Sequence, residues 1–404
     1  MANILFIPNG SGGGGSSQDR FAPKYLVGNV NNGDSVTAYS TDGFYYIPDL
    51  GDGDGIALAL SYADSSSVGF VATGDVWIRP GIYTTENSFT VPADVTVRGA
   101  GASTIIVGVP GAINQGLFTM KAGSSLRSMA LTHSEPANSV GVTNFGVVGL
   151  YEAGTVVIED VSVTSVWAAA TNRTLKACFS VAPAVAGDLS TMRCFRCAAI
   201  YEANDNNDPA SGPTDVLVGY RSYEGQLELL DCQSEFSSSG NGPSIVSFGS
   251  APITGSTLAA QMLRVEGGSY TGRVIGVYVE ASGGHVPQIS LVGARVRCAS
   301  SSVNGSYAGL KFKGDGSHIV TGCWIKSSRN AGISINPFGA AAGTCRGQIG
   351  NNTIETNAAD NAWQTNNGGG ATESYHTFLG NTYKGVIAGQ TTANDEVAHN
   401  INLP

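Results

Sequence analysis

A short strand-like pattern recurs through most of the chain at a nearly constant spacing, and this recurrence constrains the fold more than any other feature. An apolar residue is followed by a small or turn-forming residue and then by a second apolar residue, as in residues 126–131 and 320–325. Ten positions mark the repeats: Gly99, Ser128, Asp160, Arg193, Asp231, Gly267, Gly293, Gly322, Asn351 and Gly380. Their successive spacings are 29, 32, 33, 38, 36, 26, 29, 29 and 29 residues, which is typical of a repeat architecture.

Each repeat contains short strands closed by Gly, Pro or Asp, which excludes a solenoid of helix pairs. A β-propeller blade needs four antiparallel strands in about 40–45 residues, more than these intervals hold. The repeats therefore predict an all-β fold, a right-handed parallel β-helix of about ten rungs, with one turn for each interval. Val, Ile, Leu and Cys side chains are expected to point inward and to stack into a continuous core.

The sequence divides into four predicted parts. Residues 1–45 form an N-terminal arm and linker, 46–75 a capping segment with one short helix, 76–385 the β-helix, and 386–404 a C-terminal cap or inter-subunit tail. In the capping segment Asp54 is expected to N-cap the helix, which places Ile56, Leu60 and Ala63 on one face. The repeats between Asp160 and Gly267 are the longest, so their extra residues are expected to bulge outward as loops that carry function.

Composition narrows the classes of partner. A net charge of −10 argues against nucleic acid or an anionic membrane as a partner, and an acidic polysaccharide would need a local basic patch.

No apolar run approaches the roughly 20 residues that cross a membrane, and the N-terminus lacks the pattern of a secretory signal. Seven cysteines in strand-like runs predict buried free thiols and folding in a reducing cytoplasm.

Three motifs carry a resemblance to a known family. An acidic, Ala-rich segment at residues 52–60 is followed by Arg-Pro-Gly-Ile-Tyr at 79–83 and by a strand ending in Gly-Ala-Gly at 95–101. This order is similar to the N-terminal segment of pectate-lyase-like phage tailspikes and related β-helix proteins. The resemblance implies a homotrimer, an N-terminus that binds the virus particle, and contact with host surface glycans. The same segment occurs in lyases, hydrolases and adhesins, so it predicts the fold better than the activity.

The expected function is that of a bacteriophage virion surface protein, a tailspike, fibre or capsid-decorating spike made in the host cytoplasm. The apolar residues Ile4, Leu5, Phe6 and Ile7 are the expected attachment to other virion proteins. Two alternatives remain open, a polysaccharide depolymerase on the same scaffold and a secreted bacterial adhesin. A non-enzymatic role is favoured over the depolymerase.

A depolymerase that hydrolyses polysaccharide needs paired carboxylates, one acting as acid and one as base or nucleophile. The candidates are Glu202, Asp205, Asp208 and Glu224, and a solvated turn-rich loop explains the same residues. Stacking on sugar rings is assigned to Tyr220, Tyr223 and Trp324, whose alternation places only Trp324 outward; the two tyrosines could equally fill the core.

No cofactor and no metal site is predicted. Cys194 and Cys197 have C-x-x-C spacing, but no second pair or nearby histidine accompanies them, so core thiols explain the motif. The five histidines are dispersed along the sequence and form no obvious metal-binding group. In the run from Lys311 to His318, alternation predicts that Lys311 and Lys313 point outward around an inward Phe312.

Overall fold

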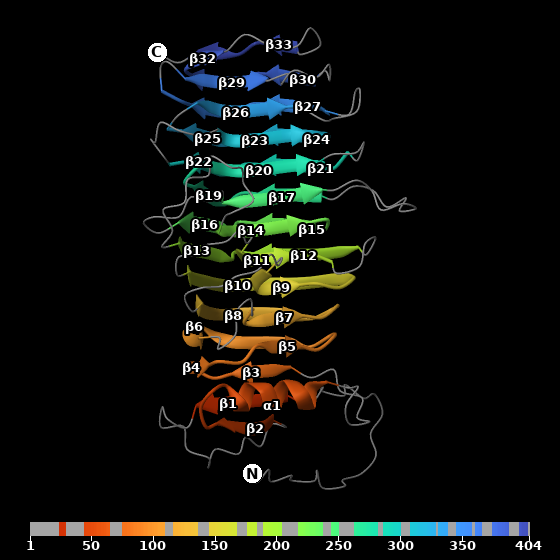
Figure 1. Cartoon of the computed structure of the whole chain (residues 1–404), viewed down its shortest axis with the longest axis vertical. Helices are drawn as coiled ribbons and strands as arrows, with labels where there is room; N and C mark the ends of the chain where they lie inside the picture. Colours follow the sequence, from red (N-terminus) through yellow and green to blue (C-terminus); the bar gives the residue numbers. More distant parts are fainter. Residues whose placement is uncertain are drawn as a thin grey trace, which may run out of the picture.

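The structure is a computed structural model that describes residues 24–29, 44–64, 75–109, 116–135, 145–167, 176–183, 189–203, 217–236, 244–249, 262–281, 286–299, 308–328, 330–337, 345–357, 360–365, 374–387 and 396–402. Its strands stack along one axis as successive turns of a right-handed parallel β-helix, with the C-terminus at the end opposite helix α1 (Figure 1). This confirms the predicted fold class. An eleven-stranded sheet contributes one strand to each turn, so the described residues make eleven such turns, close to the ten expected.

Three faces run the length of the coil, and each is built of parallel strands. Face 1 comprises β2 (Phe44–Asp49), β1 (Lys24–Asn29), β3 (Val76–Ile78), β6 (Thr96–Gly108), β8 (Ser125–Glu135), β10 (Gly154–Trp167), β12 (Ser190–Phe195), β15 (Gln226–Leu230), β18 (Met262–Glu266), β21 (Gln288–Val292), β24 (Gly316–Thr321), β27 (Cys345–Gly350), β30 (Ser374–Leu379) and β33 (Glu396–Ala398). The long strands β6, β8 and β10 bend around a corner and continue onto face 2.

The other two faces complete each turn. Face 2 comprises β4 (Gly81–Thr85), the second halves of β6, β8 and β10, then β13 (Ala198–Ala203), β16 (Gln233–Phe236), β19 (Ser269–Gly272), β22 (Arg295–Cys298), β25 (Trp324–Ser327), β28 (Thr353–Glu355), β31 (Thr382–Lys384) and β34 (Ile401–Asn402). Face 3 is the eleven-stranded sheet of β5 (Phe89–Val91), β7 (Phe118–Met120), β9 (Phe145–Leu150), β11 (Lys176–Val181), β14 (Leu217–Tyr223), β17 (Ile245–Gly249), β20 (Ile275–Ala281), β23 (Ala308–Gly314), β26 (Ala331–Asn336), β29 (Asn361–Thr365) and β32 (Val386–Ile387).

A left-handed residue turns the chain from face 1 to face 2, and at Gly267 a second one, Gly268, follows it. These corner residues are Ser128, Asp160, Arg196, Asp231, Gly267, Gly293, Gly322, Asn351, Gly380 and His399, with φ between 51° and 66°. The positions that mark the sequence repeat are therefore largely these corners, because Gly, Asn and Asp tolerate this conformation better than other residues. Two marks were misplaced: Arg193 lies in β12 and the corner is Arg196, while Gly101 rather than Gly99 has a positive φ.

After six of the corners, the following residue has a thiol or amide side chain that hydrogen-bonds to a neighbouring turn. Thiols occupy this position at Cys197, Cys232 and Cys323, and the Cys232 Sγ accepts a hydrogen bond from the Cys197 backbone at 3.4 Å. Amides follow at Asn352, Asn381 and Asn400. Nδ2 of Asn352 donates to Oδ1 of Asn381 at 3.0 Å, and Nδ2 of Asn381 donates to Oδ1 of Asn400 at 3.0 Å. The asparagines form a ladder that satisfies buried backbone groups at the C-terminal end.

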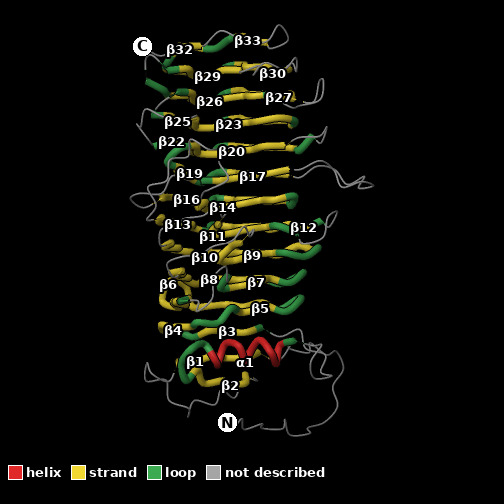
Figure 2. The backbone as a smooth tube through the Cα atoms, in the orientation of Figure 1, coloured by secondary structure: helices red, strands yellow, loops and turns green. Residues whose placement is uncertain are grey.

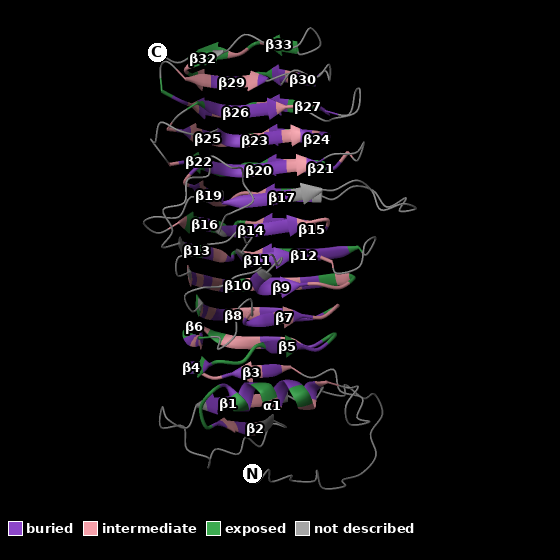
Figure 3. Cartoon of the chain, in the orientation of Figure 1, coloured by how far each residue is buried: buried purple, intermediate pink, exposed green. Residues whose placement is uncertain are grey.

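The core is one continuous column of apolar side chains inside the coil, visible as the buried colour along the strands (Figure 3). All seven cysteines are free and buried, as the sequence predicts. Burial raises the pKa of the Cys178 thiol and, well above its usual range, that of Cys197. The C-x-x-C pair therefore consists of protonated core thiols rather than a redox motif. Phe312 is inward, and Lys311 and Lys313 lie on the outer side of β23.

Helix α1 (Asp54–Ala63) lies across the N-terminal end of the coil beside β1 and β2 (Figure 2). Ile56, Leu60 and Ala63 are buried, as its periodicity predicts, but the N-cap is Gly53 at φ 71°, and Asp54 is the first helical residue. The helix shields strand edges that an open end would expose. Among the described residues, no helix combines the length and apolar character needed to span a membrane.

Strand pairing extends past both predicted limits of the β-helix. Part of the predicted arm, residues 24–29, forms β1, which pairs with β3, because Tyr25 and Val27 are apolar and buried against the helix end. At the other end β33 and β34 pair with β30 and β31, so the coil continues beyond residue 385. The attachment residues Ile4, Leu5, Phe6 and Ile7 lie outside the described residues.

Candidate functional site

Of the four predicted acidic residues, the structure describes only one side chain, that of Glu224, so it does not show whether they lie together. Glu224 lies half-buried at the turn between β14 and β15 with φ 59°. The backbone of Glu202 belongs to β13, but its side chain is outside the described part, and Asp205 and Asp208 lie wholly outside it. The paired-carboxylate hypothesis therefore stays a prediction.

Two predicted sugar-binding tyrosines lie on β14 of face 3, and they differ in exposure. Tyr220 is fully buried, stacks on Phe179 with ring centroids 5.1 Å apart, and donates a hydrogen bond to the carbonyl of Cys197 at 2.9 Å. Its assignment to glycan binding is wrong, because an inward ring in the core cannot contact a sugar. Tyr223 is half-buried, and the guanidinium carbon of buried Arg221 lies 5.7 Å from its ring centroid.

The third predicted aromatic residue, Trp324, points outward from β25 on face 2 and is half-buried. Its Nε1 donates a hydrogen bond to Oε1 of Glu355 at 2.8 Å. The Lys326 Nζ lies 5.7 Å from the Trp324 ring centroid and 3.2 Å from Oε2 of Glu355. These contacts hold the indole against the outside of the sheet with its rotation restricted.

Strand register places further cations around this tryptophan. Arg295 of β22 is the neighbour of Trp324 in the adjacent turn, Arg297 is the neighbour of Lys326, and Lys384 of β31 is the neighbour of Glu355. Turns of a parallel sheet lie about 4.8 Å apart, so these side chains share one small area. We call this area the Trp324 patch; it consists of Arg295, Arg297, Trp324, Lys326, Glu355 and Lys384.

The patch concentrates positive charge in an acidic protein. Four cations surround one carboxylate, whereas the whole chain has a net charge of −10. Arg295 and Arg297 are exposed and have no carboxylate within ion-pair distance in the described ranges. The hydrogen bond from Trp324 and the charge of Lys326 hold the pKa of Glu355 below its usual range, so this carboxylate is ionised at neutral pH. The patch is thus a local basic surface with an aromatic ring at its centre.

Several other cations on the coil are matched by carboxylates. Nε of Arg196 lies 2.8 Å from Oδ1 of Asp160, and its Nη2 lies 2.7 Å from Oε1 of Glu159. Nε of Arg193 lies 3.1 Å from Oε2 of Glu228. Ion pairs of this kind leave little net charge for a ligand to meet. The gathering of four cations around one tryptophan therefore distinguishes the Trp324 patch.

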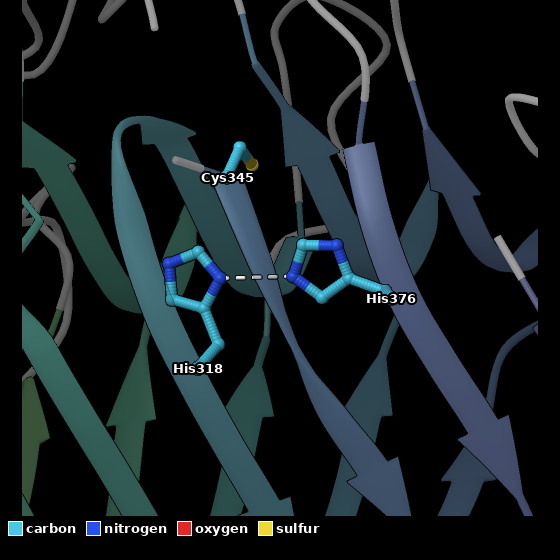
Figure 4. Close-up of side chains that lie close together, drawn as sticks. All are labelled: His318, Cys345 and His376. Atoms are coloured by element: carbon cyan, nitrogen blue, oxygen red, sulfur yellow. Dashed lines mark hydrogen bonds between the residues drawn. The ribbon is translucent and has the colours of Figure 1, made fainter. Parts of the chain in front are cut away.

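The structure also brings together residues that sequence reasoning treated as dispersed. His318, Cys345 and His376 lie on the neighbouring strands β24, β27 and β30 and face one another inside the coil (Figure 4). The expectation that the histidines form no group is corrected for this pair. The signal was available in the repeat: His318 and His376 are 58 residues apart, twice the 29-residue spacing of this section, and so occupy equivalent positions two turns apart.

Several solved structures of low sequence identity align with this chain. The Azotobacter vinelandii mannuronan C-5 epimerase AlgE6 A-module aligns with a TM-score of 0.53 and 16% identity, over 88% of this chain and 96% of that chain. The AlgE4 A-module of the same organism aligns with a TM-score of 0.49 and 15% identity, over 92% and 100%. Tailspike protein 3 of bacteriophage CBA120 aligns with a TM-score of 0.37 and 11% identity, over 94% and 62%.

The alignment with the AlgE6 A-module agrees with the parallel β-helix fold that the N-terminal motifs imply. No protein-family model matches the sequence, and no curated protein sequence matches it either. At these identities the likeness concerns the fold, because one scaffold carries many chemistries.

Proposed function

We propose that this β-helix is a bacteriophage virion surface protein that binds an acidic host-surface polysaccharide through the Trp324 patch. The observation that carries the proposal is the group of four cations around one outward tryptophan in a chain of net charge −10. An aromatic face stacks on a sugar ring, while neighbouring cations attract the carboxylate or other anionic groups that an acidic glycan bears. A long rigid coil presents these side chains on strands rather than on loops, which keeps the site organised before binding.

The virion part of the proposal rests on the N-terminal segment. Residues 52–101 resemble the corresponding segment of phage tailspikes, and the apolar residues Ile4 to Ile7 would attach the coil to the particle. Removing residues 1–20 should yield a folded protein that fails to join virus particles. If the truncated protein is incorporated normally, the N-terminal arm does not attach the coil to the particle. Three coils side by side are the expected assembly, so light scattering should give the mass of a trimer, and a monomer would contradict it.

Binding is tested with purified protein and host capsule or lipopolysaccharide. Trp324→Ala should weaken binding about tenfold, which corresponds to about 1.4 kcal/mol for loss of stacking. Arg297→Ala should weaken it and reduce its salt dependence, because exposed charges act through screened electrostatics. Arg193→Ala is the matched control, since it removes an equal charge from an ion pair on face 1. Equal binding by all variants, or no binding of acidic glycan, would overturn the proposal.

A polysaccharide-processing enzyme is the second candidate. The epimerase that shares the fold acts, by its name, on mannuronan, a polysaccharide. In that case the acid and base would be sought among Glu202, Asp205, Asp208 and Glu224. Incubation with host glycan should then release new reducing ends or unsaturated sugars, and Asp205→Asn or Glu224→Gln should abolish the release. Intact glycan after incubation would exclude this candidate and leave binding alone. A secreted adhesin, the third reading, would be found in the culture medium without particles.

A further inference from the structure

The interior of the coil holds a nitrogen and sulfur cluster that glycan binding does not use. Along face 1, His318, Gly347 and His376 occupy one register position in three successive turns, and Gly316, Cys345 and Ser374 occupy the position two residues earlier. The side chains of His318, Cys345 and His376 are all buried. Glycine at position 347 leaves the middle turn without a side chain, so the imidazoles above and below it approach each other (Figure 4).

The distances within the cluster are close to those of a ligand set. Nδ1 of His318 lies 3.0 Å from Nε2 of His376, and one ligand atom from each of His318, Cys345 and His376 lies within 4.8 Å of the others. Two imidazole nitrogens on one ion are roughly 3.3–3.6 Å apart, given metal–nitrogen distances of about 2.0–2.1 Å. The rings therefore need to separate by only about half an ångström to accept an ion between them.

The two rings are oriented as a pair of metal ligands would be, because each directs one nitrogen at the other. Oγ of Ser374 lies 2.7 Å from Nδ1 of His376, so that nitrogen can donate to the hydroxyl while Nε2 faces the cluster.

The surroundings of His318 accommodate an imidazole at a cost in stability. Nε2 of His318 is buried and has no hydrogen-bond partner among the described residues, and it carries the proton when Nδ1 binds an ion. An unsatisfied buried polar atom destabilises the folded protein, and an ordinary apolar core position would avoid that loss. Gly316 is also required here, because a Cβ at that residue would lie 2.3 Å from this nitrogen. Two glycines and a serine thus accommodate two histidines at a position where Val or Ile would fill the coil.

We propose that His318 Nδ1, His376 Nε2 and Cys345 Sγ form a trigonal binding site for a soft monovalent cation, with Cu⁺ as its ligand. Soft thiolate favours Cu⁺, and imidazole is also suited to copper. One thiolate and two neutral imidazoles balance the single charge of Cu⁺, whereas Zn²⁺ would leave a net charge in the core and would seek a fourth ligand. On binding, the Cys345 thiol transfers its proton to solvent as the copper–sulfur bond forms, and copper keeps its oxidation state.

Bound copper would join β24, β27 and β30 of three successive turns. Because a ligand that binds only the folded protein stabilises it, loading should raise the midpoint of thermal unfolding. The ion would be enclosed during folding, since all of its ligands are buried.

The experiment uses the full chain produced with copper or with zinc in the medium and purified under reducing conditions. Elemental analysis should find about one copper ion per chain after growth with copper. X-ray absorption on this wild-type protein should show one sulfur and two nitrogen neighbours around Cu⁺, a readout that needs no variant. Absence of copper above background, or a copper environment without sulfur, would overturn the proposal. If the protein instead binds one zinc ion per chain with four ligands and takes up little copper, the assignment to a monovalent cation would be wrong.

Variants identify the ligands. Cys345→Ser should lower the copper content at least about tenfold while the circular dichroism of the coil is retained. Cys323→Ser is the matched control, because Cys323 is also a buried free thiol but lies at the corner after Gly322, outside the cluster. Equal copper in the two variants would exclude Cys345 as a ligand. If Cys345→Ser fails to fold, the sulfur neighbour seen in the wild-type protein decides the same question.

Discussion

Nδ1 of His318 lies 3.0 Å from Nε2 of His376 although 58 residues separate them in the chain. The contact exists because turns of this coil stack in register, so residues two turns apart become neighbours when the turn between them carries glycine. His318 also stacks on Phe312 with ring centroids 4.2 Å apart. The imidazoles are thus part of the packed core, and their chemistry depends on the column in which they lie.

Adding one methyl group at Gly347 should disrupt this column. A Cβ there would lie 2.1 Å from the carbonyl oxygen of His318, and a backbone atom cannot move aside cheaply. Gly347→Ala is expected to lower the free energy of unfolding by about 1–3 kcal/mol. Chemical denaturation followed by circular dichroism measures the change. Gly350→Ala is the control, since its nearest contact would be a carbonyl oxygen at 3.0 Å, and equal losses in both variants would contradict the steric argument.

The metal-free protein should lose stability in acid through its buried histidines. The pKa of His376 is lowered from 6.5 to about 3, and that of His318 lies well below 6.5, so the unfolded chain binds more protons than the folded protein in this interval. Their stabilising contribution is complete above pH 6.5 and is lost as the pH falls towards 3, by up to about 1.4 kcal/mol per pH unit for each histidine. Denaturation midpoints between pH 7 and 4 measure this slope.

Replacing one histidine separates this effect from general acid denaturation. His376→Gln should flatten the slope, because glutamine has no proton to gain in this range. His399→Asn removes an exposed histidine from a left-handed corner that asparagine tolerates, and should leave the slope unchanged. An unchanged slope in His376→Gln would exclude the buried pair as its origin.

The asparagine ladder should be important for the C-terminal turns. Oδ1 of Asn381 accepts hydrogen bonds from the backbone nitrogen of Asn352 at 3.1 Å and from its Nδ2 at 3.0 Å, while Nδ2 of Asn381 donates to the Ile349 carbonyl. Asn381→Ala leaves these buried groups unsatisfied and should cost about 1–3 kcal/mol. Gln348→Ala, at an exposed position of β27, should change the denaturation midpoint little. A loss no larger than that of the control would show that solvent or rearrangement replaces the ladder.

The corner at Gly322 offers a test of backbone strain without a steric clash. Its φ is 64°, and the only atom near an added Cβ would be the Gly293 nitrogen at 3.9 Å. Gly322→Ala should therefore cost about 1–2 kcal/mol from the left-handed conformation alone. Gly322→Asn should cost less, since Asn351 holds the equivalent corner one turn later at φ 57°. If wild type and Gly322→Ala have equal unfolding midpoints, the left-handed conformation at this corner does not destabilise a non-glycine residue.

Glu355 is expected to oppose binding of an acidic glycan. Glu355→Gln removes the one negative charge of the Trp324 patch but keeps an acceptor for the Trp324 indole. Affinity for acidic polysaccharide should rise about twofold to tenfold, with a steeper salt dependence, because the cations are then unopposed. Glu266→Gln, which removes a carboxylate paired with Arg264 on face 1, is the matched control. An affinity that falls or is unchanged would argue against an anionic ligand at this patch.

The repeat in the sequence predicted the coil because turn chemistry is local. A left-handed corner favours Gly, Asn or Asp whatever surrounds it, so the corners reappear at regular intervals in the chain. The exceptions are Ser128, Arg196 and His399, whose residue types do not predict such a corner, so the repeat in the sequence does not locate the corner at Arg196. Strand alternation was equally local and correctly placed Phe312 inward and Trp324 outward.

The candidate sites could not be predicted from the sequence, because their residues meet only through the stacking of particular turns. Tyr220 is buried and Tyr223 half-buried on the same strand, and nothing in their sequence neighbourhood distinguished a stacking surface from a core position. The cations of the Trp324 patch come from three strands that are separate in sequence, so their convergence depends on register.

By itself the sequence determined a stack of short parallel strands with an apolar interior, since periodicity and turn preferences act over a few residues. Only the tertiary structure decided which side chains share a column, because the loops between corners vary in length and alter the register. A histidine pair two turns apart, a thiol beside it and a cluster of cations on one face are consequences of that alignment.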